Sequence, residues 1–157
     1  MTIEITIVMD SNQRANIVKE VLLDLPEWFG LPESTQAYID EARELTMFVA
    51  KVDSEIAGFI TLGETSADCA ELHAMGVKKY YHRQGIGRLL YNAFEQEAAL
   101  NFKLIQVKTV DEGHYKEYDQ TIAFYLKMGF MKLEVLPTLW DEWNPCLILV
   151  KPVNQLD

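Results

Sequence analysis

Apolar and polar residues alternate along the first quarter of the chain in patterns that predict a strand followed by two helices. Residues 2–8 alternate with period two, which is typical of a strand. Asp10 and Ser11 then offer N-cap chemistry for a helix that reaches about Leu25. Ser34 or Thr35 is predicted to cap a second helix, which ends near Leu45.

The same reading predicts six further strands and two further helices. Strands are expected over residues 47–52, 56–62, 70–77, 104–110, 130–136 and 146–150, with a polar turn at 53–55 and a loop holding Trp140 between the last two. An amphipathic helix follows residue 85, and a shorter one over 121–127 ends at Gly129. This order predicts one α/β (α+β) domain over residues 1–152, with a frayed tail at 153–157.

Composition narrows the classes of partner. The 157 residues are 49% hydrophobic and carry a formal net charge of −10, which disfavours nucleic acid and anionic membranes. The acidity would steer cationic amines toward the protein, or it keeps the protein dispersed in solution. Cys69 and Cys146 lie far apart in apolar stretches, as expected of reduced thiols. With no basic leader and no apolar run of about 20 residues, a cytoplasmic location is expected.

The most informative segment is the turn over residues 77–88, which places Gly85 and Gly87 between a strand and a helix. Glycines let backbone approach a ligand, and the first N–H groups of a helix attract anions, so this turn can hold a pyrophosphate. It can also be a plain tight turn. A dinucleotide fingerprint would need a third glycine where Leu90 stands, and a Walker loop would need Gly-Lys-Ser/Thr, which is absent.

Two blocks resemble motifs of the GNAT N-acetyltransferase superfamily. The first resembles the acyl-CoA signature Gln/Arg-x-x-Gly-x-Gly/Ala, with His82 at the Gln/Arg position and Gly85 and Gly87 as its glycines. The second, residues 123–130, is similar to the late-helix pattern Phe-Tyr-x-x-x-Gly-Phe. The resemblance implies a mixed, mostly antiparallel sheet of about seven strands, splayed at its centre and flanked by about four helices.

The resemblance also implies acetyl-CoA as cosubstrate and names the residues that would hold it. The backbone of Met75, Gly76 and Val77 would line the pantetheine arm. The pyrophosphate would be surrounded by residues of the turn, namely Arg83, Gln84, Gly85, Ile86, Gly87 and Arg88. A homodimer is expected by analogy with the family.

Direct acetyl transfer needs a base for the amine and a donor for the departing thiolate. By resemblance, Glu71 is expected to be the base and Tyr125 the acid, although Glu71 can also be a solvent-facing strand residue and Tyr125 a packing residue. His73 follows Glu71 by two, so both side chains should face one way. The acceptor site is expected to include Trp28, Phe29, His73 and Trp140, although these aromatics can equally cover the core or a dimer interface.

The spacing of His73, His82 and His114 matches no metal site, so no metal is expected. These features together predict an N-acetyltransferase that moves an acetyl group from acetyl-CoA to a primary amine of a small molecule or peptide. The alternatives are a non-catalytic acyl-CoA-binding regulatory module and acyl transfer to a hydroxyl or from a longer acyl chain.

Overall fold

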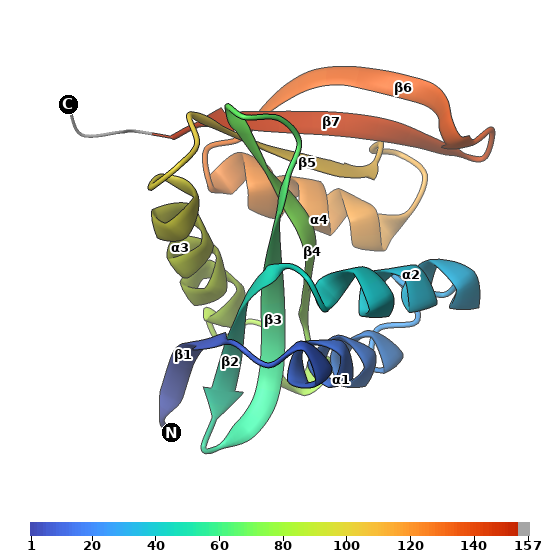
Figure 1. The fold of residues 1–157 in the computed structure, drawn as a ribbon. Coiled ribbons are helices and arrows are strands. Elements are labelled where there is room, and N and C mark those ends of the chain that lie inside the picture. Colours follow the sequence, from blue (N-terminus) through green and yellow to red (C-terminus); the bar gives the residue numbers. More distant parts are fainter. Residues whose placement is uncertain (154–157) are drawn as a thin grey trace.

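In a computed structural model, which describes residues 1–153, seven strands form one sheet in the order β1-β2-β3-β4-β5-β7-β6 (Figure 1). The strands are β1 (Ile3–Val8), β2 (Thr46–Val52), β3 (Glu55–Glu64), β4 (Cys69–Val77), β5 (Leu104–Val110), β6 (Met131–Asp141) and β7 (Asn144–Pro152). All neighbours pair antiparallel except β4 and β5, which run parallel. The prediction of a mixed, mostly antiparallel sheet of about seven strands is confirmed.

Four α-helices flank this sheet, again as predicted: α1 (Ser11–Leu23), α2 (Pro32–Ala42), α3 (Ile86–Ala98) and α4 (Lys116–Lys127). Asp10 caps α1, since its carboxylate accepts a hydrogen bond from the Gln13 N–H at 2.9 Å. The predicted cap of the second helix was wrong. That helix begins earlier, at Pro32, because proline at the first helical position is preorganised and has no N–H to leave unpaired.

The last helix also begins earlier than the predicted residue 121. Its first turn contains Glu117 and Asp119, whose negative charges favour a helix N-terminus, so the polar segment before residue 121 is partly helical. Its end at Lys127, followed by Gly129 at a φ of 101°, agrees with the prediction.

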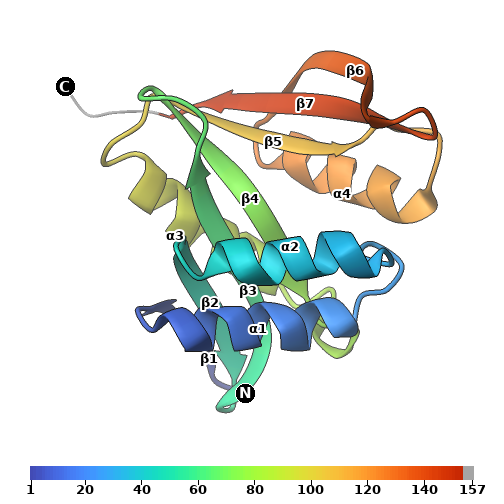
Figure 2. The ribbon, with the colours of Figure 1, turned by 45° about the vertical axis from the view of Figure 1, so that its right-hand side comes forward.

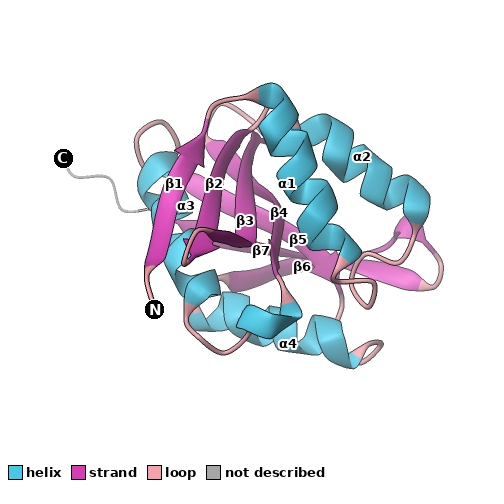
Figure 3. Ribbon diagram, turned by 90° about the horizontal axis from the view of Figure 1, so that it is seen from below, coloured by secondary structure: helices cyan, strands magenta, loops and turns pink. Residues whose placement is uncertain are grey.

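The helices form two layers, with the sheet between them (Figure 3). Helices α1 and α2 cover one face, where Val18, Val21 and Leu22 pack with Met47 and Phe59. Helices α3 and α4 cover the other face, where a larger core forms around residues such as Leu90, Phe94, Ile105, Ile122 and Leu149. Each face of the sheet therefore has its own core.

The centre of the sheet opens because β4 and β5 pair over only three positions, Cys69 with Leu104, Ala70 with Ile105 and Glu71 with Gln106. Beyond these the two strands diverge, as Figure 2 shows. The second half of β4, from Leu72 to Val77, therefore has β3 on one side and no strand on the other. The expected central splay is confirmed.

The C-terminal hairpin differs from prediction at its tip. Instead of a loop, β6 continues to Asp141 and β7 begins at Asn144, so Trp140 lies on a strand. The strand tolerates Pro137 because β6 is an edge strand, where a missing N–H costs no ladder hydrogen bond. Val153 is buried and donates its N–H to the Lys103 carbonyl at 2.9 Å, whereas the rest of the predicted tail, 154–157, lies outside the described residues.

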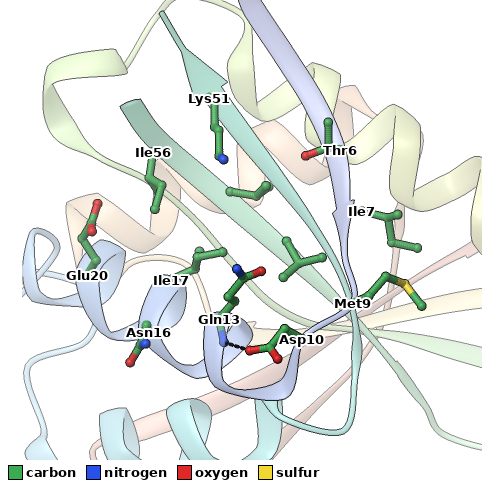
Figure 4. Close-up of a pocket in the computed structure, with 12 residues that line it drawn as sticks. Thr6, Ile7, Met9, Asp10, Gln13, Asn16, Ile17, Glu20, Lys51 and Ile56 are labelled. Carbon is green, nitrogen blue, oxygen red and sulfur yellow. Dashed lines mark hydrogen bonds between the residues drawn. The ribbon is translucent and has the colours of Figure 1, made fainter. Parts of the chain in front are cut away.

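A groove of about 560 Å³ lies between α1 and the first three strands (Figure 4). None of the predicted site residues lines it. Two of its polar residues serve the fold, since Asp10 caps α1 and Glu20 pairs with Lys78. No helix within the described residues has the length and apolar character needed to cross a membrane.

Candidate active site

The glycine turn lies directly beyond β4 and begins with a short 3-10 helix, Lys79–Tyr81. Arg83 and Gly85 then adopt positive φ angles of 64° and 79°, which turn the chain into α3. Leu89 is the first residue whose N–H bonds back, to the Gly85 carbonyl at 3.2 Å. The N–H groups of residues 86–88 precede this bond and have no intrahelical acceptor, so they are available to an anion.

Gly87 is needed for close packing rather than for an unusual backbone angle. A Cβ atom there would lie 3.3 Å from the Met75 methyl group and 3.5 Å from the Phe124 ring. The position therefore lies where α3, β4 and α4 approach one another, beside the opening of the sheet. A larger side chain would fill that space.

Cations near the turn divide into two groups. Lys78 pairs with Glu20 and Lys79 with Glu27, both at 2.5 Å, and the Lys79 N–H also donates to Asp24. These contacts hold α1 and the residues after it against the turn. The side chains of Arg83 and Arg88 form no hydrogen bond or ion pair within residues 1–153 and both residues are exposed, so they remain free for phosphate.

His82 makes a different contact from the arginine beside it. Its Nε2 lies 2.6 Å from the Val77 carbonyl oxygen, to which it must donate. The Lys78 N–H of the same peptide group donates to Ala57 in β3, so the Val77 carbonyl faces away from β3, toward the splay. The imidazole also meets the Trp28 ring edge-on, with centroids 6.0 Å apart. His82 thus ties the turn to β4.

Glu71 lies at the fork of the sheet, where it is the last residue of β4 to pair with β5. Its Oε2 is 3.2 Å from the Lys108 ammonium, and its side chain is 22% exposed. Glu71 Oε1 and the His73 Cβ lie at the same distance, 3.7 Å, from the point that a Cβ at Gly63 would occupy. The two side chains therefore face the same way, as predicted.

Tyr125 reaches the larger core from α4 and is only 6% exposed. Its ring packs edge-on against Phe124 and Phe130 at 5.7 and 5.6 Å, but its hydroxyl forms no hydrogen bond within residues 1–153. Burial, and secondly the nearby Tyr38 phenol, raise the pKa of Tyr125 well above its usual value. The hydroxyl therefore stays protonated and can donate a hydrogen bond to a ligand.

Tyr38 and Glu41, both on α2, join the site although the sequence analysis did not single them out. The Tyr38 ring lies edge-on to Phe29 at 5.7 Å and to His73 at 5.4 Å. Glu41 Oε2 is 2.6 Å from His73 Nε2. Burial, followed by the charges of Glu41 and Glu71, raises the pKa of Tyr38. The sequence did contain a signal that these two residues act together, because positions 38 and 41 are three apart and so share one helix face.

The match to a family model settles the class of this protein. Residues 43–132, more than half of the chain, match the model of the acetyltransferase (GNAT) domain. The chain belongs to the GNAT acetyltransferase family. The resemblance found in the two sequence blocks is thereby confirmed, as is the prediction that the protein is an N-acetyltransferase.

Solved structures of other GNAT proteins share the fold over nearly the whole chain. A GNAT-family protein from Desulfovibrio desulfuricans superposes with a TM-score of 0.84 at 19% identity, over 98% of this chain and 100% of that one. The aminoglycoside 6'-N-acetyltransferase from Enterococcus faecium gives 0.75 at 22%, over 98% and 99%. A GNAT acetyltransferase from Elizabethkingia anophelis with acetyl-CoA bound gives 0.74 at 17%, over 96% and 97%.

The aromatic residues predicted to line the acceptor site of this GNAT domain fall in different places. Phe29 is linked to His73 through the Tyr38 ring. Trp28 is engaged with other parts of the protein, since its indole donates to the Glu117 carbonyl at 3.2 Å and its own carbonyl accepts from Tyr118. Trp140 lies apart from these rings, 45% exposed near the end of β6.

The cysteines of this GNAT domain are both free, as the sequence led us to expect. Burial is the main reason that the pKa of each thiol, Cys69 and Cys146, lies above its usual value. Protonated thiols are poor nucleophiles, so neither cysteine is suited to form an acyl-enzyme. Within residues 1–153 no three His, Cys, Asp or Glu side chains are grouped as a metal would require.

Proposed function

We propose that this GNAT protein transfers the acetyl group of acetyl-CoA directly to a primary amine of a small molecule or peptide. The observation that carries the proposal is the parting of β4 and β5 after the Glu71–Gln106 pair, next to the free N–H groups of the glycine turn. An extended pantetheine arm fits along an unpaired strand edge, and a pyrophosphate fits an N-terminal helix turn. The acetyl-CoA-bound relative has the same fold.

Several residues would hold the acetyl-CoA. The backbone of Met75, Gly76 and Val77 lies along the unpaired part of β4. The pyrophosphate would accept hydrogen bonds from the first turn of α3, with Arg83 and Arg88 supplying positive charge and Gln84, Gly85, Ile86 and Gly87 supplying backbone. His82 would position the turn without touching phosphate, because its imidazole is bound to the Val77 carbonyl.

Acetyl transfer needs a base and a hydrogen-bond donor, and these lie on opposite sides of the opening between β4 and β5. The amine nitrogen attacks the thioester carbonyl, a C–N bond forms and the C–S bond breaks. Glu71, on the α2 side, removes the proton that the amine must lose, directly or through one water. Tyr125, on the α4 side, donates a hydrogen bond to the departing thiolate. No covalent enzyme intermediate forms.

The acceptor enters from the side of α2. Phe29, Tyr38 and His73 form a line of rings there, and Glu41 and Glu71 add negative charge. This combination suits a cationic amine, in agreement with the net charge of −10. Trp140 would contact only an acceptor large enough to reach the β6–β7 hairpin.

The proposal is tested with purified protein, acetyl-CoA and a panel containing an arylalkylamine, a polyamine, an aminoglycoside and a peptide with a free N-terminus. We expect release of free thiol with at least one class of amine, and Glu71→Gln should lower kcat about 100-fold with little change in coenzyme A affinity. Binding of coenzyme A without turnover on any amine or alcohol would favour the non-catalytic module. Faster turnover with an alcohol, or with a longer acyl-CoA, would instead assign the protein as an acyltransferase that uses a hydroxyl acceptor or a longer acyl chain.

A further inference from the structure

His73 occupies an irregular position in β4. In the pairing of β4 with β3, Leu72 lies opposite Leu62 and Ala74 opposite Thr61, so His73 is the extra residue of a β-bulge. His73 keeps the direction of Glu71 two residues before it, toward α2, and the bulge changes the register of the strand only beyond it. There its Nε2 meets Glu41 Oε2 at 2.6 Å, and its ring lies edge-on to Tyr38.

The contact with Glu41 decides which ring nitrogen carries the proton. An ionised carboxylate can only accept, so His73 Nε2 must be the donor, and in the neutral imidazole Nδ1 then holds the free lone pair. That Nδ1 atom is buried and has no hydrogen-bond partner within residues 1–153. Buried polar atoms are nearly always paired, so an unpaired lone pair beside a reaction site calls for a ligand or a proton.

Glu71 alone has limited means of passing a proton on to solvent. One of its oxygens is engaged by the Lys108 ammonium at 3.2 Å, and its side chain is only 22% exposed. The side chain of His73 is the least exposed of the three, at 16%, whereas that of Glu41, which it contacts, is 57% exposed. The partly buried His73 ring therefore lies between the fork of the sheet and the exposed Glu41 carboxylate.

We propose that Glu41 is a positioning residue, which holds His73 in the tautomer whose Nδ1 accepts the proton that Glu71 removes from the amine. The inference rests on the proposed function. The proton passes from the amine nitrogen to Glu71 and then, through a bridging water, to His73 Nδ1. The imidazolium that forms is balanced by the Glu41 carboxylate, Glu71 returns to its ionised form, and the proton leaves to solvent after the product.

The groups that face His73 define what else could affect it. They are Tyr38 and Glu41 on α2 and Glu71 on its own strand, with Lys108 of β5 held on Glu71. Only Glu41 among these is within hydrogen-bond distance of the imidazole. Its removal therefore tests the tautomer without removing the ring, the aromatic contact or the Glu71–Lys108 pair.

The test compares Glu41→Ala with Glu44→Ala, a matched loss of charge at an exposed neighbouring position whose side chain has no partner within residues 1–153. With the amine that wild type acetylates fastest, at saturating concentration, we expect Glu41→Ala to lower kcat at least about tenfold, with coenzyme A affinity changed less than about twofold. Glu44→Ala should match wild type. His73→Gln should lower kcat at least as much, and the double variant no further, because the two residues act as a unit.

The imidazole ¹⁵N resonances of His73 give a second readout that needs no substrate. We expect the Nε2–H tautomer in wild type and a mixture of tautomers in Glu41→Ala, with Glu41→Asp restoring part of both the signal and kcat. Unchanged kcat or an unchanged tautomer in Glu41→Ala, or additive losses in the double variant, would overturn the inference while wild-type turnover stands. Absence of turnover in wild type would instead overturn the proposed function.

Discussion

Replacing Tyr125 with phenylalanine separates catalysis from packing unusually well in this protein. The substitution keeps a ring that packs against Phe124 and Phe130 and removes only a hydroxyl that has no hydrogen-bond partner within residues 1–153. Because burial holds the pKa of Tyr125 above its usual value, the wild-type hydroxyl is a neutral donor at physiological pH. Its loss should therefore be felt by the leaving thiolate and hardly at all by the folded state.

The structure sets the expected magnitudes. A typical protein hydrogen bond contributes about 1 kcal/mol to stability, and none is broken here, so the free energy of unfolding should change by less than that. Loss of one donor to the leaving group typically costs about 100-fold in rate, or about 2.7 kcal/mol of transition-state stabilisation. We expect kcat to fall by that factor while coenzyme A affinity stays within about twofold.

Tyr91→Phe provides the matched control. Tyr91 packs against the same Phe130 ring at 5.8 Å, but its hydroxyl donates to Glu95 at 2.8 Å. Losing a hydrogen bond to a charged group should destabilise the fold by about 1.5–3 kcal/mol and leave kcat unchanged. Thiol-release kinetics and urea unfolding measure both quantities. Wild-type turnover in Tyr125→Phe, or a stability loss larger than that of Tyr91→Phe, would refute the reasoning.

Three further changes test the turn, the α1 contacts and the hairpin. Gly87→Leu should weaken coenzyme A binding at least about tenfold by calorimetry, because even its Cβ would lie 3.3 Å from Met75; unchanged affinity would place the ligand elsewhere. The hydrogen bond from Lys79 lowers the pKa of Glu27, so the stability that this pair contributes is present above the ordinary glutamate pKa and is lost as pH falls through the lowered value. Glu27→Gln should therefore make the free energy of unfolding fall less steeply at acidic pH. The same steepness in the variant as in wild type would contradict this. Asp141→Ala removes the acceptor of the Trp143 N–H at 2.8 Å, so amide exchange should accelerate at the hairpin tip without loss of global stability, whereas unchanged exchange there would argue against that cap.

The sequence by itself determined the elements and the family of this protein. Period-two and helical patterns locate most strands and helices, because the alternation of buried and exposed side chains is a local consequence of backbone geometry. The glycines at 85 and 87 and the block around Tyr125 predicted the fold through their resemblance to GNAT motifs, and the structure shows local demands that these motifs meet, namely a positive φ, close packing and a helix end. Helix starts at Pro32 and Lys116 were missed because several neighbouring residues are acceptable caps.

Only the tertiary structure decided how side chains distant in the sequence combine. No local pattern reveals that Lys108 would pair with Glu71, because that contact depends on the register of β5 against β4. The same holds for Glu41 and His73, which meet because α2 packs across the face of β4. Hydrogen bonds and ion pairs act over only a few ångströms, whereas the residues that form them lie 32 or 37 positions apart in the chain. Folding alone brings them within reach.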